Sequence, residues 1–110
     1  MKELVWLGDA REQVRTFPLG VRDEVGYALY LAQSGGKHRN AKPLHGLGSG
    51  VMEIRSVETS GAYRVVYVAS WRDRVFVVHA FQKKSTVGIA TPRRELELVR
   101  RRLQALRGED

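Results

Sequence analysis

The pattern of hydrophobic and polar positions changes its period along the chain, from helical in the first third to alternating in the middle. Helical spacing is kept by Val21, Val25, Ala28, Leu29 and Ala32. This spacing predicts an amphipathic helix. Pro18 suits its first turn, and Gly35-Gly36 suits its end, where the backbone needs a positive φ.

Less regular segments flank this helix. Residues 2–7 (KELVWL) predict a short strand. Asp9, with Glu12 three residues later, has the capping-box spacing that begins a short helix. Residues 37–50 (KHRNAKPLHGLGSG) are basic, rich in glycine and without periodicity, so we expect a loop there.

An alternating pattern in the middle of the chain predicts three strands joined by tight turns. We expect them at residues 51–57 (VMEIRSV), 62–69 (AYRVVYVA) and 75–82 (VFVVHAFQ). The last of these is apolar on both faces, which is typical of a central strand that is covered on both sides. Adjacent strands of this kind pair antiparallel.

A final helix is predicted after a short basic loop at residues 83–90. Thr91 is its expected N-cap and Pro92 its first helical residue. Its apolar stripe consists of Leu96, Val99, Leu103 and Leu106. The predicted order is therefore β-α-α-β-β-β-α, an α+β fold with a mainly antiparallel twisted sheet packed by helices.

Length and composition limit what this fold can do. At 110 residues the chain suits one domain, residues 1–110. Nineteen Lys and Arg against twelve Asp and Glu give a net charge of +7. This charge favours a polyanionic partner: nucleic acid, an acidic membrane face or an acidic protein. The sequence predicts no signal peptide and no membrane-spanning segment, so we expect a cytoplasmic protein that does not bind a membrane.

Several kinds of catalytic site have no basis in this sequence. Cysteine is absent, which excludes disulfides, thiolate catalysis and Cys-ligated metal sites. His38, His45 and His79 lie far apart in different predicted elements, so a histidine metal site is disfavoured. There is no Gly-rich phosphate loop and no nucleophile-elbow sequence. We therefore expect neither a metal nor a small-molecule cofactor.

A cluster of charged residues is predicted on the sheet. Glu53 and Arg55 share one face of the first long strand, Arg64 lies in an otherwise apolar run of the second, and Lys83 and Lys84 follow the third. Antiparallel pairing brings these residues within reach of one another. Several cations with one carboxylate suit a phosphodiester ligand.

RNA cleavage needs no metal in principle, because the neighbouring 2′-hydroxyl can attack the phosphorus. Clustered Arg and Lys stabilise the charge that develops on the phosphate. A Lys among other cations has a lowered pKa, so it can act as acid or base. Glu53 is an alternative base, provided that Arg55 does not neutralise it.

Five short motifs follow one another along the chain: 42–44 (KPL), 50–55 (GVMEIR), 63–67 (YRVVY), 79–85 (HAFQKKS) and 91–95 (TPRRE). In this order and spacing they resemble the HigB-like branch of the RelE/ParE toxin superfamily, whose members are often labelled phage-derived proteins. The likeness runs from about Lys42 to Leu106.

This resemblance implies a compact RelE-like toxin fold and ribosome-dependent cleavage of mRNA. It implies a cognate antitoxin from the adjacent gene, of the helix-turn-helix DNA-binding kind, besides the ribosome and mRNA as partners. Arg64 would contact the scissile phosphate, Lys83 and Lys84 would be the basic residues after the last strand, and Glu53 and Arg55 would be the Glu-x-Arg pair. We also expect RNA contacts from Lys42, His45, Arg93, Arg94 and Arg101.

Other interpretations of the same residues remain open. Arg64 and Glu53 also suit a structural salt bridge, and Lys83 and Lys84 a solvated strand end. His79 is expected to be a core histidine with its hydrogen bonds satisfied. ParE-like relatives inhibit DNA gyrase without cutting RNA, so a non-enzymatic gyrase inhibitor is the first alternative. A degenerate, non-toxic binding protein is the second.

Overall fold

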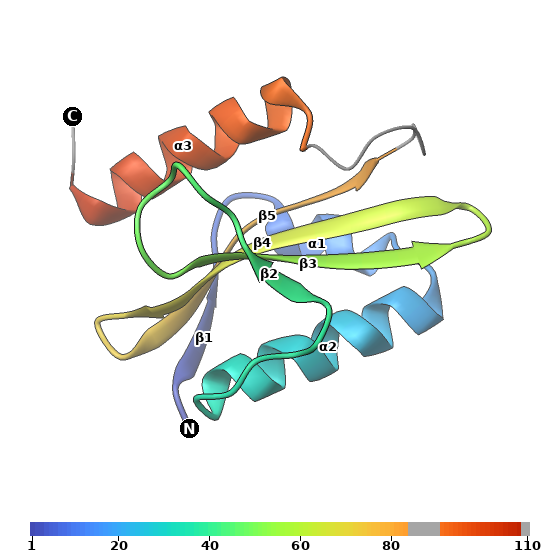
Figure 1. The fold of residues 1–110 in the computed structure, drawn as a ribbon, viewed down its shortest axis with the longest axis horizontal. Helices are drawn as coiled ribbons and strands as arrows, with labels where there is room; N and C mark the ends of the chain where they lie inside the picture. Colours follow the sequence, from blue (N-terminus) through green and yellow to red (C-terminus); the bar gives the residue numbers. More distant parts are fainter. Residues whose placement is uncertain (84–90, 109–110) are drawn as a thin grey trace.

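A five-stranded sheet in the order β1-β5-β4-β3-β2 forms the centre of the molecule (Figure 1). The computed structural model describes residues 1–83 and 91–108. The strands are β1 (Glu3–Trp6), β2 (Ala41–Pro43), β3 (Val51–Glu58), β4 (Gly61–Trp71) and β5 (Arg74–Lys83). The helices are α1 (Ala10–Arg15), α2 (Leu19–Gln33) and α3 (Arg93–Arg107). β1 pairs with β5 in parallel and the other pairings are antiparallel, which confirms the predicted α+β fold.

Two details of the sheet differ from the prediction. The predicted loop at residues 37–50 contains β2, which pairs antiparallel with β3 at the sheet edge. Three residues are too few to show an alternating pattern, so no pattern in the sequence indicated this strand. The middle strand is β4, whereas β5 lies between β1 and β4. β5 is nevertheless buried on both faces, as its apolar sequence predicts.

The helix starts differ from the predicted caps. Both long helices begin directly after a proline, with Pro18 and Pro92 at the N-cap position and no side-chain cap. Thr91 therefore lies one residue before the N-cap of α3. Asp9 is the N-cap residue of α1, but its carboxylate makes no capping hydrogen bond. The predicted capping box with Glu12 is wrong, because Gln13 and Arg102 bind the Asp9 carboxylate instead.

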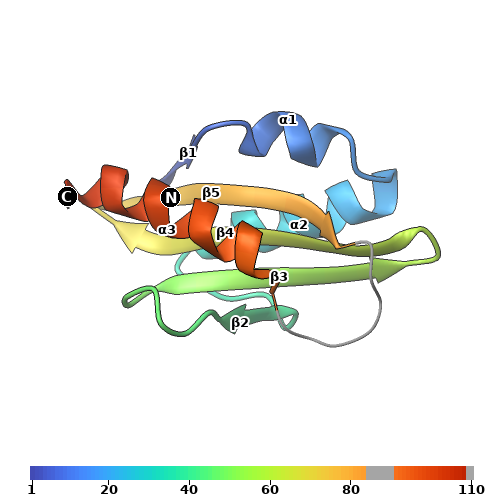
Figure 2. The same cartoon turned by 90° about the horizontal axis from the view of Figure 1, so that it is seen from above.

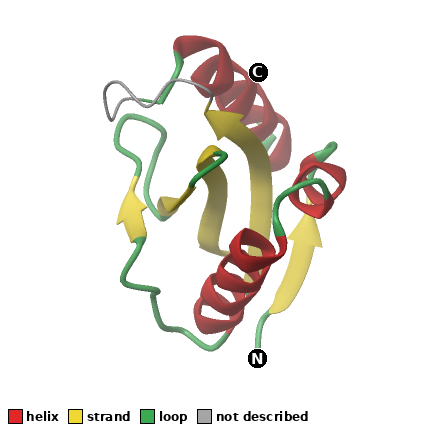
Figure 3. Ribbon diagram, turned by 90° about the vertical axis from the view of Figure 1, so that its right-hand side faces the viewer, coloured by secondary structure: helices red, strands yellow, loops and turns green. Residues whose placement is uncertain are grey.

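Helices cover both faces of the sheet (Figure 3). The core beneath α1 and α2 includes Phe17, Val25, Leu29, Ile54 and Tyr67. The core on the other face includes Val66, Phe76, Val78, Val99 and Leu103, and here α3 lies over β4 and β5 (Figure 2). The predicted apolar stripe of α3 is confirmed by this second core. In the part of the chain that the structure describes, no helix is both long and apolar enough to span a bilayer.

A register shift in β5 changes which side chains face α3. Val66 of β4 pairs with His79, whereas the next residue, Tyr67, pairs with Val77. Val78 is thus an extra residue in the strand, as in a β-bulge. Both Val78 and His79 consequently lie on the α3 face, where Val78 packs in the core and His79 contacts α3.

Candidate active site

The register of β3, β4 and β5 gathers the predicted charged residues on the α3 face of the sheet. Arg55 lies directly opposite Arg64 in the β3–β4 pair, and Lys83 lies opposite Ala62 in the β4–β5 pair. Residues two apart on a strand, and residues paired across two strands, share one face, so Glu53, Arg55, Ala62 and Arg64 lie on the same side of the sheet. We call Glu53, Arg55, Arg64 and Lys83 the cationic cluster.

The Glu53 carboxylate holds the centre of the cationic cluster and is 1% exposed. Its Oε1 accepts hydrogen bonds from Arg55 Nε at 3.1 Å and Arg64 Nη1 at 3.2 Å. Its Oε2 accepts one from the Thr91 hydroxyl at 2.7 Å. Two guanidinium groups and a hydroxyl therefore already bind this carboxylate. Its geometry is that of a counter-ion that orients the two arginines.

Arg64 is buried and carries unused hydrogen-bonding capacity. Within residues 1–83 and 91–108, its Nε is the one buried side-chain nitrogen or oxygen without a hydrogen-bond partner. Burial lowers the pKa of Arg64, an effect that the Glu53 charge opposes and the Arg55 charge reinforces. Buried donors are nearly always paired, so this unpaired N–H identifies a position where an acceptor is missing.

Lys83 lies at the end of β5 and is also buried. Burial lowers the pKa of Lys83, the charges of Arg64 and Arg55 lower it further, and Glu53 opposes them. A lysine with a lowered pKa gives up its proton more readily than an exposed one, which suits proton transfer. Lys84, the next predicted site residue, lies outside the described residues.

The predicted RNA-binding residues lie on two segments of the chain and are all exposed. Lys42 on β2 lies opposite Glu53 in the sheet, and His45 follows in the glycine-rich loop. Arg93, Arg94 and Arg101 lie along α3, where Arg93 forms an ion pair with Glu97. We call these five exposed residues the basic surface.

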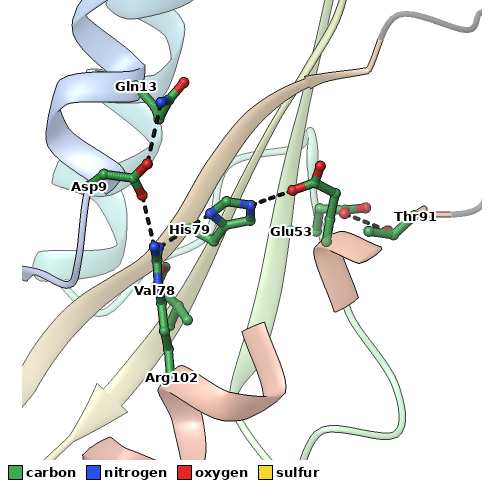
Figure 4. Close-up of polar contacts among 8 residues, drawn as sticks. Asp9, Gln13, Glu53, Val78, His79, Thr91 and Arg102 are labelled. Atoms are coloured by element: carbon green, nitrogen blue, oxygen red, sulfur yellow. Dashed lines mark hydrogen bonds and ion pairs between the residues drawn. The ribbon is translucent and has the colours of Figure 1, made fainter. Parts of the chain in front are cut away.

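A second polar network lies on the same face and was not predicted (Figure 4). Arg102 donates to the Asp9 carboxylate at 2.8 Å and to the Val78 carbonyl at 2.8 Å. Arg102 Nη1 also lies 3.3 Å from His79 Nδ1, and His79 Nε2 lies 2.7 Å from a Glu95 oxygen. Since Arg102 only donates, His79 Nδ1 accepts and His79 Nε2 carries the proton donated to Glu95. We call Asp9, His79, Glu95 and Arg102 the helix-docking network.

The helix-docking network confirms His79 as a buried histidine with satisfied hydrogen bonds. The hydrogen bond from Arg102 is the main cause that lowers the pKa of Asp9, and the positive charge of Arg102 lowers it further. Burial of the carboxylate acts in the opposite direction. Tyr67 belongs to the core on the opposite face, where burial raises its pKa to about 12. Tyr67 is therefore a packing residue, as its apolar strand predicts. In the described part of the chain, no three His, Asp or Glu side chains are grouped to hold a metal ion.

Thr91 is the site residue that sequence reasoning missed. Its position before Pro92 indicated a helix cap, yet its hydroxyl binds Glu53, 38 residues away in the chain. Arg64 Nη1 also lies 3.5 Å from the Thr91 hydroxyl oxygen. The only available signal was its place in the TPRRE motif, which the comparison with toxins had already singled out.

Comparisons with known proteins identify the family of this chain and support its fold. The family described as Phage derived protein Gp49-like matches residues 12–104. A crystal structure of the isolated E. coli RelE toxin superposes with a TM-score of 0.58 and 22% sequence identity, covering 92% of this chain and 98% of that chain. A comparison with curated proteins gave no significant match. The chain thus belongs to the Gp49-like family of phage-derived proteins, a family of RelE/HigB-type toxins, and has the RelE-like fold.

Proposed function

We propose that this protein is the toxin of a type II toxin–antitoxin system and a ribosome-dependent mRNA endonuclease. The single observation that carries the proposal is Arg64 Nε, a buried donor without a partner beside two further cations. Among the described residues, Arg55, Arg64 and Lys83 gather near the single carboxylate of Glu53, and the buried Arg64 Nε lacks an acceptor. A phosphodiester supplies negative charge next to these cations and an acceptor oxygen for Arg64 Nε.

The proposed reaction uses the RNA's own 2′-hydroxyl and no metal. The 2′-hydroxyl gives up its proton to solvent water as the 2′-oxygen attacks the phosphorus, the bond to the 5′-oxygen breaks, and the products are a 2′,3′-cyclic phosphate and a 5′-hydroxyl. Arg64 and Arg55 stabilise the negative charge that develops on the phosphoryl oxygens. Lys83 donates a proton to the leaving 5′-oxygen, a role that its lowered pKa supports. Lys84 enters the proposal on the family resemblance alone, as a further positive charge.

The basic surface provides the partner-binding part of the proposal. Lys42, His45, Arg93, Arg94 and Arg101 would contact phosphates of ribosomal RNA and mRNA, which gives affinity without sequence preference. A cognate antitoxin with a helix-turn-helix DNA-binding domain, encoded by the adjacent gene, would neutralise this surface. Such a toxin acts in the cytoplasm, where ribosomes translate mRNA.

Controlled expression in bacteria, with mapping of mRNA 5′ ends, tests the proposal. We expect wild type to arrest growth and to create new 5′ ends at fixed codon positions. Arg64→Ala should lose both, with a reduction in cleavage of about 10²–10³-fold, comparable to the loss of one transition-state donor. Arg74→Ala is the matched control, because Arg74 is an exposed β5 arginine whose partner is Glu3.

Each other outcome of this experiment has a clear meaning. Growth arrest with intact mRNA and DNA damage signalling would replace the proposal with a ParE-like gyrase inhibitor. No arrest by any variant, with no cleavage on purified translating ribosomes, would leave a non-toxic binding protein. Retained cleavage in folded Arg64→Ala would remove Arg64 from the site.

A further inference from the structure

A second group of arginines lies towards the C-terminal end of α3, away from the cationic cluster. Arg72 belongs to the turn between β4 and β5, whereas Arg100 and Arg107 belong to α3. This turn, the glycine-rich loop between β2 and β3, and the C-terminal end of α3 lie at one end of the molecule (Figure 1, Figure 2). We call Trp71, Arg72, Arg100 and Arg107 the Trp71 patch.

The Trp71 ring holds two of these arginines together. The guanidinium carbon of Arg72 lies 5.6 Å from the centre of the ring, and that of Arg107 lies 5.9 Å from it. Arg107 also donates to the carbonyl oxygens of Leu47 at 3.0 Å and Ser49 at 3.3 Å. Three segments that are distant in the sequence are thus fixed around one aromatic ring.

The arginines of the Trp71 patch have donors available for an anion. In the described part of the chain, Arg72 and Arg100 are exposed and form no ion pair. Of the acidic residues near them in the sequence, Asp73 lines a separate cavity beside the N-terminus, and Glu97 is bound to Arg93. A guanidinium presents several N–H groups in a planar fork that suits phosphate oxygens.

A cavity of about 270 Å³ adjoins this patch between α3 and the glycine-rich loop. Arg100, Gln104 and Arg107 line it from α3, and Gly46 and Gly48 line it from the loop. Two arginines and an amide on one wall supply the N–H donors that a phosphate group requires.

The turn that carries Arg72 is strained. Arg72 and Asp73 form the two-residue loop of the hairpin, in which Trp71 pairs with Arg74, and their φ angles are 52° and 62°. Hairpin loops with positive φ favour Asn, Asp and Gly, and a bulky residue such as Arg is unusual there. Because strained residues gather at functional sites, the strain indicates that Arg72 is placed for binding and not for the stability of the hairpin.

Two elements show that the Trp71 patch is more than 20 Å from the cationic cluster. The 15 residues of α3 give it a length of about 22 Å. Along β4, the step from Arg64 to Trp71 covers about 23 Å at the usual rise per residue. A phosphate bound at the patch is therefore not the scissile one. A flexible single strand would have to be ordered over this distance, whereas the phosphates of folded ribosomal RNA are already fixed in place and bind at a lower entropic cost.

We propose that the Trp71 patch binds phosphate groups of ribosomal RNA and holds the protein on the ribosome while the cationic cluster acts on mRNA. This inference rests on the proposed function, which supplies the ribosome as the partner. The patch adds affinity to that of the basic surface and takes no part in the chemistry. Phosphate contacts of this kind are independent of sequence and weaken as salt is added.

The experiment measures binding to purified ribosomes without mRNA at several salt concentrations. Arg72→Asn removes the charge and suits the positive φ, whereas Arg72→Lys keeps the charge. Arg22→Gln is the matched control, because it removes the same charge from an exposed position on α2, on the other side of the sheet. The kcat and KM for cleavage of ribosome-bound mRNA, and the temperature of unfolding, are measured for the same variants.

We expect Arg72→Asn to bind ribosomes about tenfold more weakly, the equivalent of one charge-assisted hydrogen bond. The slope of log affinity against log salt concentration should become less steep by about one, as for one lost phosphate contact. KM should rise with no comparable fall in kcat, and Arg72→Asn should unfold at the temperature of wild type or above it. Arg72→Lys should retain most of the affinity, and Arg22→Gln all of it.

The other outcomes separate this inference from the proposed function. Wild-type ribosome affinity in Arg72→Asn, with cleavage intact, would overturn the role of the patch and leave the proposed function standing. Weaker binding with an unchanged salt slope would point to a protein surface, and a loss seen only once mRNA is bound would point to mRNA; either result overturns the inference. Wild type that neither binds ribosomes nor cleaves mRNA would overturn the proposed function itself.

Discussion

The cationic cluster and the helix-docking network occupy the same face of the sheet, and both lie beside α3, yet their charges are arranged differently. The cationic cluster has three cations and one carboxylate, and one of its buried donors is unpaired. The helix-docking network has one permanent cation, two carboxylates and a histidine, joined into one chain.

This difference separates an arrangement that needs a further ligand from one that is complete. A chain of mutually satisfied groups fixes a structure, because each partner lowers the desolvation cost of the next. A buried N–H without an acceptor, such as Arg64 Nε, costs stability unless something else binds there. The comparison predicts that mutations of the three cations in the cationic cluster affect function first, whereas mutations of their counter-ion Glu53 and of the helix-docking network affect stability first.

Removal of Glu53 should have the largest effect on stability. Glu53→Ala leaves Arg64 buried without its counter-ion, and losing one partner of a buried ion pair costs about 3 kcal/mol. Urea unfolding should show this loss, with Glu3→Ala, which breaks an exposed pair, as the control. Added sulfate should restore part of the stability by occupying the vacated anion position. A loss unaffected by sulfate would contradict the anion-binding character of the cluster.

Substitution of Lys83 should lower the rate of mRNA cleavage more than it lowers the free energy of unfolding. Lys83→Met should slow mRNA cleavage about 10²-fold, the lower range for a lost proton-transfer group. NMR titration of lysine Cε–Hε signals should place the Lys83 midpoint below the usual 10.5, because burial and two arginines disfavour its charged form. Arg64→Ala should move this midpoint upward, since it removes one of those charges. An unchanged midpoint would refute the electrostatic coupling between Lys83 and Arg64.

Substitution of His79 is the matching test in the helix-docking network. His79→Ala leaves Glu95 and Arg102 each without one partner, and the expected loss of stability is about 2 kcal/mol. His79→Gln should lose less, because an amide both donates and accepts. Cleavage per folded molecule should stay within about twofold of wild type in either variant. A folded His79→Gln protein that no longer cleaves would place the network within the active site.

Much of the fold could be predicted because its signals are local. The alternating pattern predicted the strands β3, β4 and β5, and the apolar stripe of α3 predicted which face of this helix is buried. The grouping of Glu53, Arg55 and Arg64 followed from strand parity and antiparallel pairing, both of which the sequence indicates. β2 was missed because three residues carry no periodicity, and its pairing depends on the neighbouring strand.

The missed contacts share a physical cause. Asp9 and Thr91 were both expected to cap helices, and each instead bonds a charged group from a distant segment. A charge-assisted hydrogen bond is about twice as strong as a neutral one, so tertiary contact prevails over the local cap. Which distant charge arrives depends on packing of α3 across the sheet, and local sequence does not encode that arrangement.

Asp9→Asn should have the smallest effect on the free energy of unfolding. The pH dependence of this effect tests whether Asp9 stabilises the helix-docking network through its charge. Arg102 lowers the pKa of Asp9 below its ordinary 3.8, so the folded state binds a proton at this site less readily than the unfolded state. The stabilisation from this pair is therefore complete above the unfolded pKa and is lost as pH falls through the folded pKa. Because the Asp9 side chain is half exposed, its contribution should stay below about 1 kcal/mol. Urea unfolding of wild type and Asp9→Asn should differ at pH 6 and converge near pH 2, and a difference that persists in acid would show that Asp9 acts through packing instead of charge.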